Sequence, residues 1–191
     1  MNTRIIRLFI SVFLCALILS ISSCSFLTSP PSAVHDLGYP YANVPPENAT
    51  LPQQPPVTVD APKWLSDTRI RYRLLYARPT QVRFYSLDRW IAPPPELLEQ
   101  LLNNSEKPWP MPVNIKLQVF EQQFDSAEKA KVVMHFTATT LPSDNKQLVH
   151  KQEFNLQLPC PTPDAEGAVT SYNILTKQAI DKVRAWVIGL N

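Results

Sequence analysis

The sequence has very few glycines for its length. Only three occur among its 191 residues, namely Gly38, Gly167 and Gly189. A loop that cradles phosphates needs several clustered residues that adopt positive φ, and glycine does so without steric cost. Hydrolysis of a nucleotide by this chain is therefore excluded.

Cysteine is equally scarce. Cys15 lies within the apolar N-terminal run and Cys24 follows that run, which leaves Cys160 alone in the rest of the chain. We therefore expect no disulfide framework. Because no His or Lys lies near Cys160 in the sequence to lower the pKa of its thiol, we expect a partly buried apolar residue rather than a nucleophile.

The chain also has little net charge. It carries 18 basic and 16 acidic residues, and the excess is supplied by Arg4 and Arg7 at the extreme N-terminus. A general nucleic-acid binder neutralises many phosphates, so a nucleic-acid partner is not expected.

Recognisable catalytic motifs are missing as well. The sequence contains no nucleophile elbow, no His-Glu-x-x-His and no Cys-x-x-Cys, so we expect no catalytic residues, no cofactor and no enzyme. The strand alternation predicts that His135 and His150 lie on opposite faces of their sheet, and hence that they form no metal site.

The N-terminus has the order of an export signal. Arg4 and Arg7 precede an apolar run over residues 8–21, which is 14 residues long and shorter than the about 20 needed to cross a bilayer. Residues 21–24, Ile-Ser-Ser-Cys, resemble a bacterial lipobox. The resemblance predicts a lipoprotein signal peptide over residues 1–23, with diacylglycerol and an N-acyl chain on Cys24.

The residues after Cys24 predict a tether. Ser25 follows the lipidated cysteine, and by resemblance to the sorting rule of enterobacterial lipoproteins the absence of Asp there implies the periplasmic face of the outer membrane. Eight prolines occur over residues 25–56 and disfavour helices and central strands. Fully extended, such a tether spans about 100 Å. Within it, residues 35–38 have strand-like potential and could add to a sheet edge.

Residues 57–191 show the periodicities of a folded α+β domain. Apolar alternation predicts strands over residues 57–60, 69–77, 81–85, 113–119, 132–138 and 148–158. Leucines at helical spacing follow the prolines at 93–95, and a longer helical stripe covers residues 169–190. We expect a mostly antiparallel sheet with the helices packed on one face and a long C-terminal helix.

Arginines form the most distinctive charged pattern. They alternate with apolar residues in one strand of the hairpin over residues 69–85, and the pairing of the two strands predicts one shared face. This predicted arginine face consists of Arg69, Arg71, Arg73 and Arg83. Two interpretations remain open. The face is solvated and partly neutralised by acids such as Glu153, or it docks carboxylates of a partner or anionic lipid headgroups.

Four short motifs carry a family resemblance. They are His35-Asp36-Leu37-Gly38, Ala61-Pro62-Lys63-Trp64-Leu65, Ile70-Arg71-Tyr72-Arg73 and Tyr85-Ser86-Leu87-Asp88-Arg89-Trp90-Ile91-Ala92-Pro93-Pro94. In order and spacing they resemble the ABC-type transport auxiliary lipoproteins, with Trp64, Tyr72, Arg89 and Trp90 as structural motif residues.

The resemblance implies a function without catalysis. Members of the family accompany inner-membrane lipid transporters with MCE-type periplasmic subunits, so we expect an outer-membrane adaptor that docks such a subunit in a phospholipid pathway. An alternative is a periplasmic carrier with its own acyl cavity between the sheet and the C-terminal helix. Exposed strand edges leave a homo-oligomer open.

Overall fold

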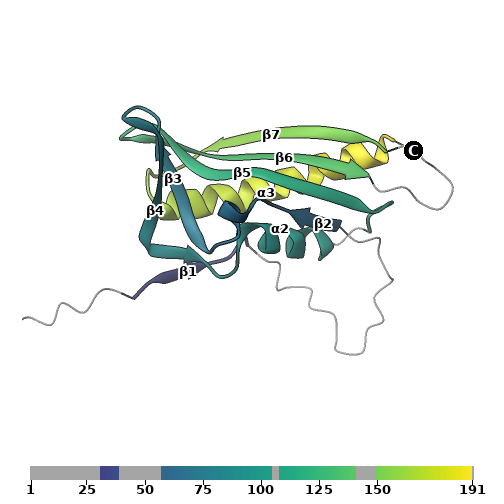
Figure 1. The fold of residues 1–191 in the computed structure, drawn as a ribbon, viewed down its shortest axis with the longest axis horizontal. Helices are drawn as coiled ribbons and strands as arrows, with labels where there is room; N and C mark the ends of the chain where they lie inside the picture. Colours follow the sequence, from purple (N-terminus) through teal and green to yellow (C-terminus); the bar gives the residue numbers. More distant parts are fainter. Residues whose placement is uncertain (1–30, 39–56, 105–107, 141–148, 191) are drawn as a thin grey trace, which may run out of the picture. The chain divides into compact units, whose positions relative to one another are not determined.

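The computed structural model describes residues 31–38, 57–104, 108–140 and 149–190. The predicted signal peptide and Cys24 lie outside these ranges, as does most of the predicted tether. The elements in chain order are β1 (Ala33–His35), β2 (Val57–Asp60), a 3-10 helix (Lys63–Leu65), β3 (Arg69–Leu74), β4 (Arg78–Trp90), α2 (Pro94–Asn103), β5 (Val113–Ser126), β6 (Lys129–Thr140), β7 (Lys151–Pro159) and α3 (Ala165–Ile188). Figure 1 shows α3 running along the sheet.

The strands form one mixed sheet in the order β1-β4-β3-β5-β6-β7, and β2 also pairs with β5. The α+β class and the long C-terminal helix are confirmed, but the expectation of a mostly antiparallel sheet needs correction. Three pairings are parallel, namely β1 with β4, β2 with β5 and β3 with β5. Local alternation could not indicate them, because each joins segments that are far apart in the chain.

The long strand β5 organises the sheet. One of its edges carries two strands, with β2 paired along Val113–Lys116 and β3 paired along Gln122–Phe124. Its pairing with β6 shifts register between Leu117 and Val119. Because a one-residue shift reverses the alternation, Leu117 and Phe120 are both buried in the core, at 0% and 3% exposure.

Both helices contribute to a single core on one face of the sheet, which we call the core face; the opposite face is the outer face. The leucines of α2 join the same cluster as the strands and α3. The ring of Tyr172 in α3 stacks on Phe120 at 3.9 Å between centroids. Trp90 lies edge-on to both rings and is only 2% exposed, as expected for a core residue. These aromatic contacts fix α3 against the sheet.

The helix α3 begins at Ala165, four residues before the predicted start at 169. Asp164 caps it, because its Oδ1 accepts a hydrogen bond of 2.8 Å from the Gly167 N–H. A Cβ on Gly167 would come within 2.0 Å of the Thr162 carbonyl oxygen. Gly167 is therefore required, because any side chain there would collide with the backbone at Thr162.

The first strand lies at the edge of the sheet. The structure places it at Ala33–His35, partly ahead of residues 35–38, and it pairs with β4 beside Asp88, Arg89 and Trp90. The His35 Nε2 lies 2.8 Å from Asp88 Oδ1. Leu37 is 2% exposed in the core, and Gly38 has a φ of 74°. Residues 33–38 thus belong to the folded domain, which begins before residue 57.

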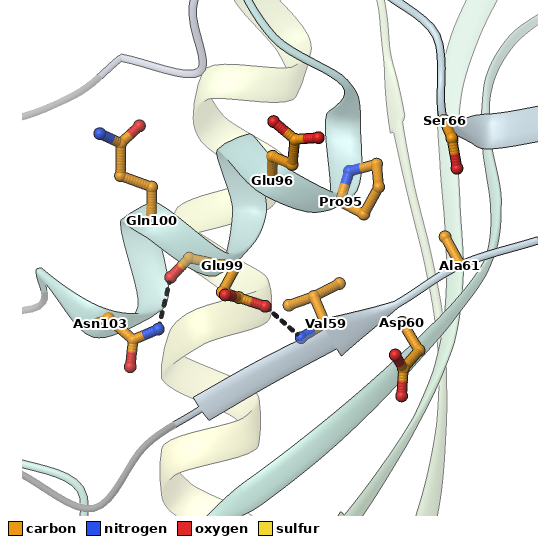
Figure 2. Close-up of a pocket in the computed structure, with 9 residues that line it drawn as sticks. All are labelled: Val59, Asp60, Ala61, Ser66, Pro95, Glu96, Glu99, Gln100 and Asn103. Atoms are coloured by element: carbon orange, nitrogen blue, oxygen red, sulfur yellow. Dashed lines mark hydrogen bonds between the residues drawn. The ribbon is translucent and has the colours of Figure 1, made fainter.

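Side chains of α2 hold the free edge of β2. The Asn103 Oδ1 accepts from the Val57 N–H at 3.0 Å, and its Nδ2 donates to the Val57 carbonyl at 2.7 Å. The Glu99 Oε2 accepts from the Val59 N–H at 2.7 Å, as Figure 2 shows. These two side chains occupy the place that a neighbouring strand would take.

The substitution Asn103→Ala tests this edge. It leaves the backbone N–H and carbonyl of Val57 without these partners, so we expect the free energy of unfolding to fall by about 1–3 kcal/mol. Chemical denaturation measures it. The matched control is Gln100→Ala, an exposed position on the same helix, and an equal loss in both variants would contradict this role of Asn103.

Candidate functional site: the outer face of the sheet

The arginines do not share one face. Arg71 lies opposite Phe84, and Tyr72 lies opposite Arg83. Residues directly opposite each other in an antiparallel pair point to the same side, so Arg83 lies on the side of Tyr72 and not with the other three arginines. The prediction for Arg83 is therefore wrong. The cause is irregular pairing of β3 with β4, whose register shifts between Arg69 and Arg71 and again after Tyr72.

Two of the remaining arginines converge on one carboxylate. The Asp67 Oδ2 accepts from Arg69 at 2.8 Å and from Arg71 at 3.2 Å. The Arg69 guanidinium also stacks over the Phe84 ring at 3.7 Å from its centroid. Burial raises the pKa of Asp67, but the hydrogen bonds from Arg69 and Arg71 outweigh burial and hold the pKa below its usual value.

Arg73 is paired with a buried acid. Its Nε donates to both oxygens of Glu121 at 2.8 and 2.9 Å, and Gln123 donates to the same carboxylate at 3.0 Å. The Glu121 side chain is only 11% exposed. The expectation that Glu153 neutralises the arginines is wrong, because Glu153 lies on β7 opposite Thr137 and the neutralising acids are Asp67 and Glu121.

A hollow of about 450 Å³ lies beside these ion pairs. It is lined by Trp64, Leu65, Arg71, Arg73, Val82, Gln118, Val119, Phe120 and Glu121. In the described part of the chain, no strand pairs with this edge of β5 between Lys116 and Gln122, so the hollow lies at the gap between β2 and β3. Trp64 is 63% exposed at this site. An exposed tryptophan beside arginines is the composition of protein-binding hot spots.

A second hollow, of about 390 Å³, lies between β2 and α2. Figure 2 shows Asp60, Glu96 and Glu99 around it. Two of these carboxylates have structural partners, because Glu99 accepts from Val59 and Asp60 accepts from Asn114. Among the described residues, no group of His, Cys, Asp and Glu could hold a metal ion. Two carboxylates of the second hollow therefore serve the junction between β2, β5 and α2.

Cys160 lies in a polar network near the start of α3. Gln122 donates to the Asp164 carbonyl at 3.0 Å and to the Cys160 Sγ at 3.4 Å, while Tyr85 donates to Gln122 at 2.7 Å. Burial raises the pKa of the Cys160 thiol. The thiol is therefore not an activated nucleophile, as the sequence predicted. The buried Gln122 escaped the sequence analysis, because the shift of alternation in β5 was not recognised.

The comparison with protein families identifies the family of this chain. A family model described as "ABC-type transport auxiliary lipoprotein component" matches residues 44–183. The chain belongs to this family. It is a family of transport auxiliary components and not of enzymes, and its lipoprotein character implies a membrane-anchored protein.

Solved structures share the fold of this auxiliary lipoprotein. A Xanthomonas campestris protein assigned to the family DUF330 superposes with a TM-score of 0.61 at 18% identity, covering 83% of this chain and 93% of that one. An uncharacterized protein superposes with a TM-score of 0.57 at 12% identity, covering 83% and 99%. No curated protein matches the chain. Within the described ranges, no helix is long and apolar enough to cross a membrane.

The motif residues of the family have different structural positions. Trp90 is buried in the core, and the Tyr72 ring lies 4.8 Å from the Tyr85 ring. Trp64 is exposed at the hollow, whereas Arg89 is exposed on the outer face beside Val34 of β1. Tyr72 and Trp90 therefore serve packing, and Trp64 and Arg89 are available to partners.

The lowered pKa of Asp67 predicts an acid-sensitive contribution to stability. A carboxyl whose pKa is lowered on folding stabilises the protein above its ordinary pKa, here 3.8, and this stability is lost as the pH falls through the lowered value. We expect Asp67→Asn to lower the melting temperature at pH 7 and to weaken its decline on acidification below about pH 4. Thermal melts of both proteins measure this, with Asp125→Asn, which removes an exposed pair with Lys131, as the control.

The substitution Glu121→Gln tests the Arg73 pair. It keeps the shape of the side chain but removes the charge that accepts two hydrogen bonds from Arg73, so we expect a loss of about 2 kcal/mol in the free energy of unfolding. Glu128→Gln, at an exposed turn, is the matched control. A variant as stable as the control would show that Glu121 is dispensable for the fold.

Proposed function

We propose that this lipoprotein is the outer-membrane adaptor of an ABC-type intermembrane phospholipid transport system. The observation that carries the proposal is the family match over residues 44–183, supported by the lipobox-like sequence that ends at Cys24. Diacylglycerol and an N-acyl chain on Cys24 would hold the protein firmly, because two or more chains are needed for stable anchoring. The folded domain then binds a periplasmic MCE-type subunit.

The hollow beside Trp64 is the surface best suited to this subunit. It combines an exposed aromatic ring, the apolar side chains of Val82 and Val119, and polar groups at the stretch of β5 that lies between β2 and β3. A partner segment that fills this gap buries Trp64, which supplies binding energy from a rigid side chain. Arg71 and Arg73 are already paired with acids. They therefore shape the wall of the hollow more than they attract a negatively charged partner.

The packing between the sheet and α3 gives the carrier alternative no support. An acyl cavity would have to open where Tyr172 stacks on Phe120, and Val183 and Ala179 are 0% and 2% exposed there. Close packing of this kind leaves little room for a lipid chain.

Photo-crosslinking in the native cell tests the adaptor function. A photoreactive amino acid in place of Gln118, at the hollow, is expected to capture the MCE-type subunit, whereas the same residue in place of the exposed Lys177 on α3 is not. Mass spectrometry identifies the captured protein and reads the lipid mass on Cys24 in the same sample. An unmodified Cys24, or capture of no transport subunit, would refute the proposal.

The substitution Trp64→Ala tests the anchor residue of the site. Because hot-spot aromatics contribute about 2 kcal/mol or more, we expect at least a tenfold loss of crosslinked product at Gln118. Tyr76→Ala removes another exposed aromatic, 52% exposed at the β3–β4 turn, and serves as the matched control. Both variants should unfold at the temperature of the unmodified protein, because neither side chain is buried.

A further inference from the structure

The fold shortens the link between Cys24 and the domain. Because β1 is paired with β4 and Leu37 is buried in the core, only residues 25–32 separate Cys24 from the first strand residue, Ala33. Even fully extended, this stretch reaches about 30 Å. The edge of the sheet that contains β1 must therefore stay near the membrane that holds Cys24.

This edge carries an exposed apolar and basic surface, which we call the β1–β4 patch. It consists of Val34, Arg69, Leu87, Arg89 and Ile91. Val34 lies opposite Arg89 across β1 and β4, and Arg69 lies opposite Arg89 across β3 and β4, so these three side chains share the outer face. Leu87 and Ile91 flank Arg89 at the alternate positions of the chain.

The apolar members of the patch are solvent-accessible. Val34, Leu87 and Ile91 are 47%, 43% and 63% exposed. On the opposite face of the same strands, Trp90 is buried and His35 contacts Asp88. The exposure is therefore not that of a frayed edge, because the residues next to these in β1 and β4 are held on the core side.

The patch is also positively charged. Among the residues that the structure describes, Arg89 makes no ion pair, and the Arg69 side chain is 55% exposed although it contacts Asp67. The acid next in sequence to Arg89, Asp88, points to the other face. Arginine matches the geometry of a phosphate group, which it contacts through two parallel N–H donors.

We infer that the β1–β4 patch rests on anionic phospholipid headgroups of the membrane that carries the lipid anchor. This inference depends on the lipidation of Cys24 in the proposed function. The short link holds the patch at the bilayer surface, Arg69 and Arg89 contact lipid phosphates, and Val34, Leu87 and Ile91 enter the boundary between headgroups and acyl chains. The covalent lipid thus attaches the protein to the membrane, and the patch orients the folded domain on the membrane surface.

A site-specific fluorescent probe tests the contact. The full-length lipoprotein is isolated from membranes with Cys160→Ser, so that a thiol introduced by Ile91→Cys takes an environment-sensitive label. The matched probe is Ile174→Cys, at a position on α3 that is 48% exposed. In vesicles of phosphatidylcholine and phosphatidylglycerol, we expect lipids with a spin-labelled headgroup to quench the Ile91 probe at least threefold more than the Ile174 probe.

Charge variants separate the role of the arginines. The double substitution Arg69→Gln and Arg89→Gln is expected to remove most of the quenching at position 91, as is replacement of the phosphatidylglycerol by phosphatidylcholine. Arg78→Gln removes one arginine charge at the exposed start of β4, away from the patch, and should leave the quenching unchanged. Equal quenching in anionic and neutral vesicles would overturn the inference of anionic headgroups.

The outcomes distinguish the patch from the anchor. If the unmodified protein fails to float with vesicles of either composition, the lipid anchor of the proposed function fails. If it floats but the probes at positions 91 and 174 are quenched equally, the patch inference fails and the anchor stands. Shielding of the Ile91 probe that rises with protein concentration in neutral vesicles would assign the patch to a second copy of the chain and overturn the inference.

Discussion

The pairing of two parallel strands with one edge of β5 is the constraint on which the rest of the structure depends. With β2 along Val113–Lys116 and β3 along Gln122–Phe124, the intervening stretch of β5 has neither strand beside it. The chain between β2 and β3 must cross this gap, and it does so through the 3-10 helix that displays Trp64. The hollow, the exposed tryptophan and the buried acid Glu121 all follow from this arrangement.

The arginines of β3 differ in role, because some are ion-paired within the fold and others remain exposed at the surface. Arg73 is committed to Glu121, and Arg71 with a side chain 9% exposed shares Asp67 with Arg69. Such pairs replace the hydration that the guanidinium groups lose, and the pair of Arg73 with Glu121 also joins β3 to β5. Among the described arginines of the predicted arginine face and the family motifs, Arg69 and Arg89 keep substantial exposure on the outer face, so the exposed arginine surface is smaller than the sequence pattern implied and lies beside β1.

The sequence was sufficient to predict most strands and helices, but not which strands pair with each other. Alternation and helical spacing predicted most strands and the leucines of α2, because these depend on local periodicity. The parallel partners of β5 could not be predicted, because they come from segments far apart in the chain. The face of Arg83 could not be predicted either, since a single shift of register reverses every later side chain. A signal was present in β5, where apolar residues change from odd to even positions between Val119 and Phe120. The partners of Arg73 and Cys160 depend on that same change.

The position of β1 has a mechanical consequence. A pull on the proposed anchor at Cys24 acts first on a three-residue strand that runs parallel to β4, and then on the segment that contains the buried side chain of Leu37. Release of this described segment would add residues 33–38 to the link and allow the domain to move farther from its point of attachment. The force that breaks the pairing of β1 with β4 therefore limits how far the domain can move from the proposed anchor at Cys24.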